Sequence, residues 1–528
     1  MSEYAGTGAL LRLAARRDRL LITLSALALT ALSVGSAKAT LDLYPDAASA
    51  RASLGAVLAA PSALALYGPA SMSTIEGLSI FKTQLMGAVF VGILAYALVR
   101  RHTRVEEEEG RLELLRSGVV GRRAPLTAAV LLALAVTALT CLLSLAGLVG
   151  IGFDVVGSAA FAVSWLIAGL LMTGVTAVAA QLTASARGCT AWALGTLGGL
   201  YLLRAVGDTT PAAAWLSWVS PLGWVSKVGA YGDNRLVLAL PALALCALLF
   251  ALALTLLERR DLGSGLLAAR PGPARGGPGL SSPEGLVWRL NRPSILGWSI
   301  AFVVLSGVVG GLAGTVSELL ANPEVRSMLE ALGGRAGSLT DIYLATELRF
   351  IAAAAAAAGI VLALRPAGEE RSGRTEAVLA TAASRTRWFL AHAVQALLLP
   401  VLLMVLCGLV ITAAGRGAAE MPQLGVMIGA GLAAVPAAWV CVGVALALAG
   451  VRARFAPLAW GLLAVLFILG DLGTLLQLPT ALVDLSPFAH LSQLPGGTFD
   501  VLPALVLVGI AAALTAYGVL AHSRRDIG

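Results

Sequence analysis

Two short charged segments carry the residue types in this sequence that could do chemistry, and they lie 263 positions apart. Each follows an apolar stretch and repeats the same acidic residues, glycine and arginine at the same spacing. The first block contains Glu106, Glu107, Gly110, Arg111 and Glu113, and the second block contains Glu369, Glu370, Gly373, Arg374 and Glu376. Charged side chains at a fixed spacing can pair with complementary charges on another protein. A solvated loop has no reason to keep this spacing twice, so we predict that both blocks are docking surfaces for a paired partner.

The first block has the sequence features of a short helix. Thr103 and Glu106 have the spacing of a capping box, in which each side chain satisfies a backbone N–H at the start of a helix. Residues 107–109 are glutamates that would lie in the first turn, where the helix dipole favours negative charge. We therefore expect a helix that begins at Thr103 and ends before Gly118.

The elements that position these blocks are membrane-spanning helices. Of the 528 residues, 58% are hydrophobic and 12% are charged, and the mean hydropathy is +0.87. A soluble domain carries about 25% charged residues, so this composition excludes a soluble globular protein. A bilayer core needs roughly 20 apolar residues per helix, and the sequence has twelve such stretches: residues 20–36, 80–99, 126–148, 158–182, 189–206, 236–257, 295–316, 348–364, 388–413, 424–449, 457–472 and 501–521. We predict an all-α, polytopic membrane protein.

Basic residues predict the orientation of these spans. When both termini and the loops after even-numbered spans are taken as one side, that side holds 27 of the 37 Lys and Arg residues. The positive-inside rule then places both termini in the cytoplasm. Because the arginine clusters are typical of topology signals, we expect no nucleic-acid partner despite the formal charge of +8. A cleavable signal peptide is the alternative interpretation of residues 20–36, and the repeat described next favours a retained span.

The chain is an internal duplication. Besides the two blocks, the segment Arg259–Gly263 recurs as Arg524–Gly528, and Ser220-Pro221 recurs as Ser486-Pro487. We predict a first six-helix unit over residues 1–265, a cytoplasmic Pro/Gly-rich linker over 266–290 and a second six-helix unit over 291–528. Because six is an even number, the two units would be parallel repeats around an axis along the membrane normal.

The segments EEEEGRLELL and EERSGRTEAVL resemble the E-R-E-x-G-T-L-E-x-L stretch in the first cytoplasmic loop of ABC-2 type exporter permeases. The fused double length resembles the actinobacterial permeases assigned to export of polyketide antibiotics such as tetronasin. This resemblance implies two units of the ABC-2 type (type V exporter-like), with a coupling helix in each block that rests in a cleft of a separate ATP-hydrolysing subunit. Arg111 and Arg374 stand where that family usually has Thr, and the second block lacks the leucines around Glu376. These departures favour two unequal docking sites.

The sequence contains no ATP-binding motif of its own. A Walker A loop needs Gly-Lys before Ser or Thr, and the only lysines, Lys38, Lys82 and Lys227, follow Ala, Phe and Ser. The resemblance therefore implies that ATP and Mg²⁺ bind to a separate ABC ATPase subunit, in two copies, and that this chain is not an enzyme. The five cysteines and four histidines are dispersed without metal-ligand spacing, so we predict no metal site and no cofactor on the chain.

An apolar passage suits hydrophobic or amphipathic cargo, such as antibiotics and other drug-like compounds, because sugars and ions would lose their hydration. Candidate lining residues of the passage are Phe81, Met86, Phe90, Tyr201, Phe350 and Phe467. Candidate residues of an extracellular gate are Trp218, Ser220, Pro221, Ser486 and Pro487, because the resembled family has re-entrant helices at its exit. Plainer alternatives stay open, since aromatic residues in spans commonly pack against lipid or anchor a membrane interface.

We predict the membrane-spanning permease subunit of an ATP-driven ABC exporter. A proton-driven secondary multidrug transporter is the alternative, and it would need ionisable residues deep in the spans. The charged residues of the spans lie near predicted ends, where long side chains can reach the interface: Lys82, Arg204, Glu347, Arg349 and Asp471. His392 and Gln395 are the deeper polar pair. An integral membrane enzyme ranks last, because no acid, base and nucleophile converge in the spans.

Overall fold

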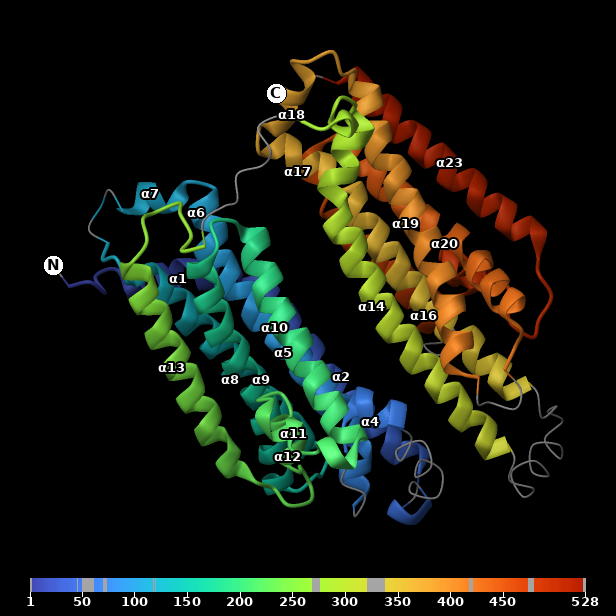
Figure 1. Ribbon diagram of the computed structural model, residues 1–528. Helices are drawn as coiled ribbons and strands as arrows, with labels where there is room; N and C mark the ends of the chain where they lie inside the picture. The colour runs from blue at the N-terminus through green and yellow to red at the C-terminus, as the bar shows by residue number, and fades with distance from the viewer. Residues whose placement is uncertain are drawn as a thin grey trace. The chain divides into compact units, whose positions relative to one another are not determined.

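The computed structural model describes residues 2–44, 46–49, 61–69, 74–116, 118, 120–267, 276–320, 338–416, 421–472 and 479–525, and every regular element in these ranges is helical. The chain divides into two compact units, Met1–Gly272 and Pro273–Gly528 (Figure 1). Part of the predicted linker, residues 268–275, lies outside the described residues. Its last part belongs to a helix that begins at Pro283, and the other predicted domain boundaries stay predictions.

Unit 1 is built around two central helices. Its long apolar helices are α2 (Arg19–Leu43), α5 (Ile75–Arg100), α8 (Ala124–Gly150), α9 (Val155–Leu182), α10 (Ala186–Thr209) and α13 (Ala239–Glu258). Its short elements are α1 (Thr7–Arg17), α4 (Pro61–Tyr67), η1 (Arg101–Val105), α6 (Glu106–Glu108), α7 (Arg111–Arg116), η2 (Pro211–Ala213), α11 (Leu216–Val219), α12 (Trp224–Lys227) and η3 (Leu236–Leu238). Helices α5 and α9 pack on each other and are largely buried, whereas α2, α10 and α13 are largely exposed.

Unit 2 repeats this plan. Its long apolar helices are α14 (Pro283–Leu320), α16 (Ser338–Ala363), α19 (Arg385–Ala414), α20 (Leu424–Val451), α21 (Leu458–Leu472) and α23 (Val501–Arg524). Its short elements are η4 (Pro278–Leu280), α17 (Arg365–Arg371), α18 (Arg374–Leu379), η5 (Ala453–Phe455), α22 (Thr480–Val483) and η6 (Pro487–His490). Helix α20 is the central one and packs on α16, α19 and α23.

A tryptophan and a glycine bring the two central helices of unit 1 together. Trp165 of α9 is fully buried and donates its Nε1–H to the carbonyl oxygens of Thr83 and Gln84 on α5, at 3.2 and 3.1 Å. A Cβ at Gly87 of α5 would lie 2.3 Å from this indole. Glycine therefore permits the close approach, and a larger residue at this position would push α5 and α9 apart.

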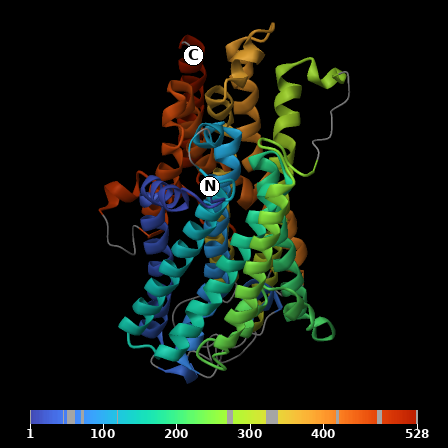
Figure 2. The same ribbon diagram turned by 90° about the vertical axis from the view of Figure 1, so that its left-hand side faces the viewer.

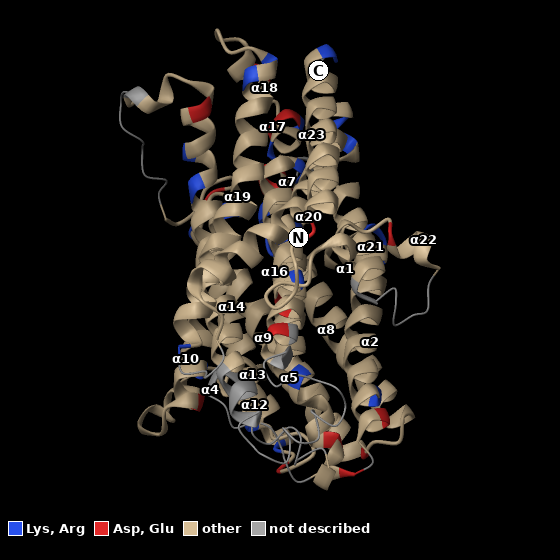
Figure 3. Ribbon diagram, turned by 90° about the vertical axis from the view of Figure 1, so that its right-hand side faces the viewer, with Lys and Arg blue, Asp and Glu red and all other residues tan. Residues whose placement is uncertain are grey.

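The prediction of twelve spans is confirmed within the described residues, because each predicted stretch overlaps one helix that is long and apolar enough to cross a membrane. Charged residues gather near the two ends of each bundle, and the middle of the long helices contains few of them (Figure 3). In unit 1 the N-terminus lies at the same end as α6 and α7, and in unit 2 the end of α23 lies beside α17 (Figure 1). We call these the block ends of the two units.

The structure corrects the predicted start of the first block helix. Thr103 lies inside the π-helical turn η1, and its hydroxyl donates to the carbonyl oxygen of Val99 at 2.6 Å instead of capping a new helix. The chain therefore runs without interruption from α5 through η1 into α6. The capping-box prediction was wrong because the helix of the preceding span supplies the backbone partners that a cap would otherwise provide. Figure 2 shows α1 in dark blue, crossing the block end of unit 1 before the chain enters α2.

Candidate functional site

The two blocks have the same local fold. In each, a helix ends at a glycine in the left-handed conformation and a second short helix follows. Gly110, with φ of 72°, separates α6 from α7, and Gly373, with φ of 70°, separates α17 from α18. Only glycine adopts this conformation at little cost, so the repeated glycines make the turn in both units.

Glu107 of the first block lies inside unit 1. Its carboxylate accepts hydrogen bonds from the Arg260 guanidinium at 2.6 and 2.9 Å and from the backbone N–H of Gly263 at 2.7 Å. Arg104 lies 3.3 Å from the same carboxylate and is itself fully buried. This cluster ties the turn after the second span to the residues after α13, the last span of the unit.

Unit 2 contains the matching ion pair. Glu370, the counterpart of Glu107, pairs with Arg525, the counterpart of Arg260. The arginine after each block has matching contacts too: Arg122 donates to the carbonyl oxygen of Arg260 at 2.9 Å, and Arg385 donates to that of Arg525 at 2.9 Å. The repeated charges at the ends of the two halves therefore join each block to the end of its own unit.

A second pair is repeated within each block. Glu106 lies 3.5 Å from Arg111 and also pairs with Arg17 of α1. The counterpart Glu369 accepts a hydrogen bond from Arg374 at 2.5 Å. Both arginines thus cross the glycine turn and hold its two sides together. This explains in structural terms why an arginine follows the glycine in both blocks.

The side chains that remain exposed define the outer surface of each block. Glu113 and Glu376 occupy equivalent positions on α7 and α18, and both are exposed. Beside them, unit 1 exposes Glu108 and Glu109, whereas unit 2 exposes Arg371. The docking role of all ten residues stays a prediction. Glu107, Glu369 and Glu370 have intramolecular partners, so a partner protein would meet Glu113 and Glu376 first.

The N-terminal segment also holds the block end of unit 1. Asp18, between α1 and α2, is almost fully buried and accepts from His102 of η1 at 2.7 Å. Arg123, just before α8, lies 2.8 Å from Glu3 and also pairs with Glu258. The Glu258 carboxylate and the Tyr4 hydroxyl raise the pKa of Arg123 above its usual value, so this arginine stays charged.

The four predicted passage residues of unit 1 differ in their surroundings, whereas the two of unit 2 contact each other. Phe81 is buried against Tyr67 at a ring distance of 5.4 Å, whereas Phe90 is 49% exposed. Met86 is half-buried on the same helix. In unit 2, Phe350 and Phe467 contact each other edge to face at 5.4 Å. A passage lined by these residues stays a prediction.

The predicted gate serines have identical structural roles. Ser220 is buried and donates to the carbonyl oxygen of Leu200 on α10 at 2.8 Å, and Ser486 donates to that of Leu466 on α21 at 2.6 Å. Each serine therefore holds the chain after the fifth span against that span. Trp218 is 47% exposed beside this turn, and Pro221 and Pro487 follow the two serines. The role of these segments as an extracellular gate stays a prediction.

The structure corrects the interpretation of Arg204 as a charged side chain that extends to the interface. Arg204 is fully buried within unit 1, lies 3.1 Å from Asp208, and donates to the carbonyl oxygens of Leu64 and Ala65 in α4. Tyr201, a predicted passage residue, donates to the next carbonyl oxygen, that of Leu66, at 2.7 Å. The i,i+4 spacing of Arg204 and Asp208 was the available signal.

Comparison with known proteins identifies relatives that cover both units. A family profile described as the C-terminal domain of the multidrug efflux system permease Rv1217c matches residues 280–522, which lie in unit 2. Over 530 residues the chain is 38% identical to the multidrug efflux system permease protein Rv1217c of Mycobacterium tuberculosis (strain ATCC 25618 / H37Rv). That match includes 100% of this chain and 96% of the relative.

Proposed function

The chain belongs to the family of the multidrug efflux system permease Rv1217c, and from this premise we propose that a separate ATPase subunit drives it by docking on the two blocks. The predicted role as the permease subunit of a drug exporter is confirmed by this relationship. The resemblance of both blocks to the coupling-helix stretch of ABC-2 type permeases points to docking by an ABC ATPase.

The observation that carries the proposal is the matched pair of glycine turns. One ion pair holds the turn of each block together, Glu106–Arg111 in unit 1 and its counterpart in unit 2. A second ion pair, Glu107–Arg260 and its counterpart, joins each block to the end of its own unit. Each then presents a short helix with one exposed glutamate at the same position. A rigid connection of this kind can transmit movement of the short helix to the last span, which is what a docking element must do.

The proposal includes the setting of the complex. Two copies of the ATPase, with ATP and Mg²⁺, bind at the cytoplasmic face of a bacterial cell membrane, where both termini of the permease also lie. The cargo is hydrophobic or amphipathic and drug-like, because the middle of the spans carries few charges that could replace a hydration shell (Figure 3).

Co-purification tests this proposal. The tagged chain is isolated from its native membranes in mild detergent, and bound proteins are identified by mass spectrometry and assayed for ATP hydrolysis. We expect a P-loop ATPase in about two copies per chain, and we expect the Glu113→Arg, Glu376→Arg double variant to lose it and to lose drug efflux while inserting normally.

A chain that purifies alone and still transports drug in vesicles without ATP would contradict the proposal. Efflux that stops with an uncoupler while ATP stays high would instead support the proton-driven alternative. In that case the buried His392, whose ring nitrogens have no hydrogen-bond partner among the described residues, would be the first residue to test.

A further inference from the structure

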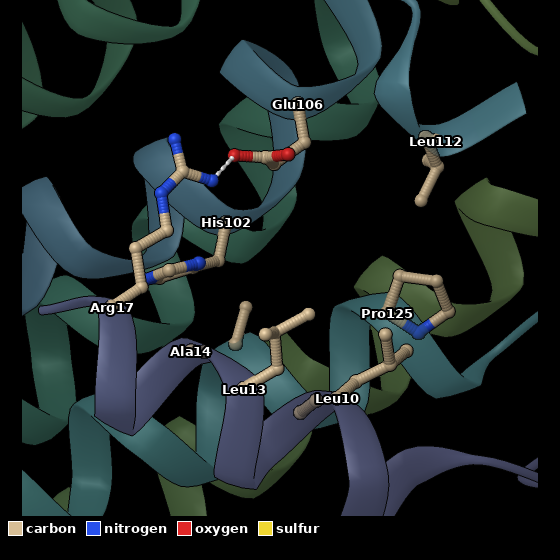
Figure 4. A pocket seen from close by; sticks show the side chains of 10 residues that line it. Leu10, Leu13, Ala14, Arg17, His102, Glu106, Leu112 and Pro125 are labelled. Atoms are coloured by element: carbon tan, nitrogen blue, oxygen red, sulfur yellow. Dashed lines mark hydrogen bonds and ion pairs between the residues drawn. The ribbon is translucent and has the colours of Figure 1, made fainter. Parts of the chain in front are cut away.

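A cavity of about 60 Å³ lies beneath helix α7 in unit 1 (Figure 4). Apolar side chains of three elements line it, among them Leu13 of α1, Leu112 of α7 and Ala129 of α8. The ion pair between Arg17 and Glu106 lies along one side (Figure 4). The cavity therefore sits directly between the first docking block and the body of unit 1.

The internal repeat explains why this cavity exists. The spacing of 263 positions that relates the two blocks continues into the next span, where Pro125 corresponds to Trp388 and Ala129 corresponds to His392. Pro125 and Ala129 both line the cavity. Unit 1 thus has two small side chains where unit 2 has an indole and an imidazole.

In unit 2 those two rings fill the equivalent place. Trp388 is 1% exposed and His392 is fully buried, and their rings meet edge to face at 4.7 Å. Val378 and Leu379 of α18 pack against the cluster that contains Trp388. The short docking helix of unit 2 therefore rests on an aromatic side chain, whereas that of unit 1 covers a cavity.

The surfaces around these two places also differ in charge. On the exposed side of the first block, Glu108 and Glu109 stand where the second block has Arg371 and Ser372. Glu109 pairs with Arg111, and Glu108 accepts a hydrogen bond from the backbone N–H of Ala186. Both glutamates stay exposed, whereas the exposed Glu113 has an equally exposed counterpart in unit 2. A segment that binds beside α7 would consequently need basic residues, and the same segment would be repelled by Arg371 beside α18.

We propose that the cavity of unit 1 receives one bulky apolar side chain of the ATPase subunit, flanked by basic residues, and that the equivalent place in unit 2 does not. A site for a drug-sized molecule has a volume of about 300–1,000 Å³, so a cavity of about 60 Å³ suits a single side chain. In unit 2 the equivalent place is filled by the indole of Trp388, which belongs to the permease itself. This inference rests on the proposed function and makes the two docking sites unequal.

A cavity-filling variant tests the inference. Ala129→Trp places an indole in the cavity from within the permease, and we expect the affinity for the ATPase subunit to fall about tenfold or more because the side chain at the centre of an interface carries much of its energy. The matched control is Leu131→Trp on the same helix, where the native side chain is 42% exposed and faces outward. We expect that variant to bind the ATPase like the unaltered chain.

Photo-crosslinking provides a test that does not depend on the folding of Ala129→Trp. A benzophenone amino acid replaces Leu13, which lines the cavity and is 57% exposed, and in a separate chain it replaces Leu24 on the outward side of α2. We expect Leu13 to crosslink an ATPase peptide that carries a bulky apolar residue next to Lys or Arg. We expect Leu24 to label only lipid.

The possible outcomes separate this inference from the proposed function. If the unaltered chain binds no ATPase, both fail. If the ATPase binds and is lost in the Glu113→Arg, Glu376→Arg variant, yet binds Ala129→Trp with unchanged affinity, the inference fails and the proposed function stands. Crosslinking of Leu13 to lipid or to a second copy of the chain would also overturn the inference.

Discussion

Glu107 pairs with two arginines at once, and both of them are buried. Arg260 and Arg104 have side-chain exposures of 6% and 0%, and the Glu107 side chain is 3% exposed. A buried charge pair contributes little net stability when it is compared with an apolar pair, but removing one partner leaves the other charge uncompensated. The function of Glu107 at this scale is therefore to hold the block in place.

We expect Glu107→Ala to destabilise unit 1 by about 3–5 kcal/mol, because two guanidinium groups would lose their carboxylate in a buried site. Glu109→Ala should change stability by less than about 1 kcal/mol, because Glu109 is exposed and its ion pair with Arg111 lies at the surface. Thermal unfolding of the detergent-purified variants measures both effects. Equal melting temperatures for the two variants would show that the Glu107 cluster is not structural.

The two left-handed glycines give a second residue-scale prediction. A side chain at a φ of about 70° costs roughly 1–2 kcal/mol, so Gly110→Ala and Gly373→Ala should each destabilise the turn of their own block by that amount. No neighbouring atom lies within 4 Å of a Cβ at either glycine, so backbone conformation is the only cause. Hydrogen exchange of the amides in α7 and α18 measures the stability of each turn separately. Unchanged exchange in Gly110→Ala would contradict the assignment.

At the scale of elements, α10 holds α4 through backbone acceptors. Arg204 and Tyr201 together bind the last three carbonyl oxygens of α4 before its final residue, those of Leu64, Ala65 and Leu66. The last carbonyls of a helix lack continuing backbone partners. The Leu64 oxygen also accepts from the backbone N–H of Gly68 at 2.9 Å, and donors from α10 satisfy the oxygens of Ala65 and Leu66. The junction lies at the end of unit 1 opposite the block end.

We expect Arg204→Met to release α4, because it removes the donors to two carbonyl oxygens and leaves Asp208 with the Ser217 hydroxyl, 2.6 Å away, as its side-chain partner. The lysine variant should not rescue the contact, since an ammonium cannot reach Asp208 and two carbonyls in the planar arrangement of a guanidinium. Limited proteolysis within residues 61–69 measures the release. Protection equal to that of the native chain would show that packing alone holds α4.

The spans and the ion pairs show which features of the fold could be predicted from the sequence. All twelve spans were predictable because hydropathy and length are local properties. The partner of Glu107 could not be predicted in this way, since Arg260 lies 153 positions away and only tertiary packing brings the two together. The repeat contained a usable signal, because both residues recur in the second half as Glu370 and Arg525. The capping box at Thr103 failed because a neighbouring span continued through it.

At the scale of the whole molecule, duplication has preserved the internal ion pairs and changed the surfaces. The pairs Glu107–Arg260 and Glu370–Arg525 match, as do the hydrogen bonds of Ser220 and Ser486. The exposed side of the blocks has instead changed from acidic in unit 1 to partly basic in unit 2. Because one chain contains both halves, its two blocks can differ in their exposed surfaces while their internal ion pairs stay matched.

The predicted arrangement of the two halves as parallel repeats can be tested with single cysteines. The five native cysteines are all buried, so a membrane-impermeant maleimide should label the unaltered chain weakly in intact cells and in inverted vesicles. Glu113→Cys and Glu376→Cys should both react only in inverted vesicles, because an even number of spans places the two blocks on the cytoplasmic side. Trp218→Cys and Leu485→Cys, at exposed positions after the fifth span of each unit, should both react in intact cells. Labelling of Glu113→Cys and Glu376→Cys from opposite sides would mean inverted repeats, and a single ATPase dimer could then not reach both blocks.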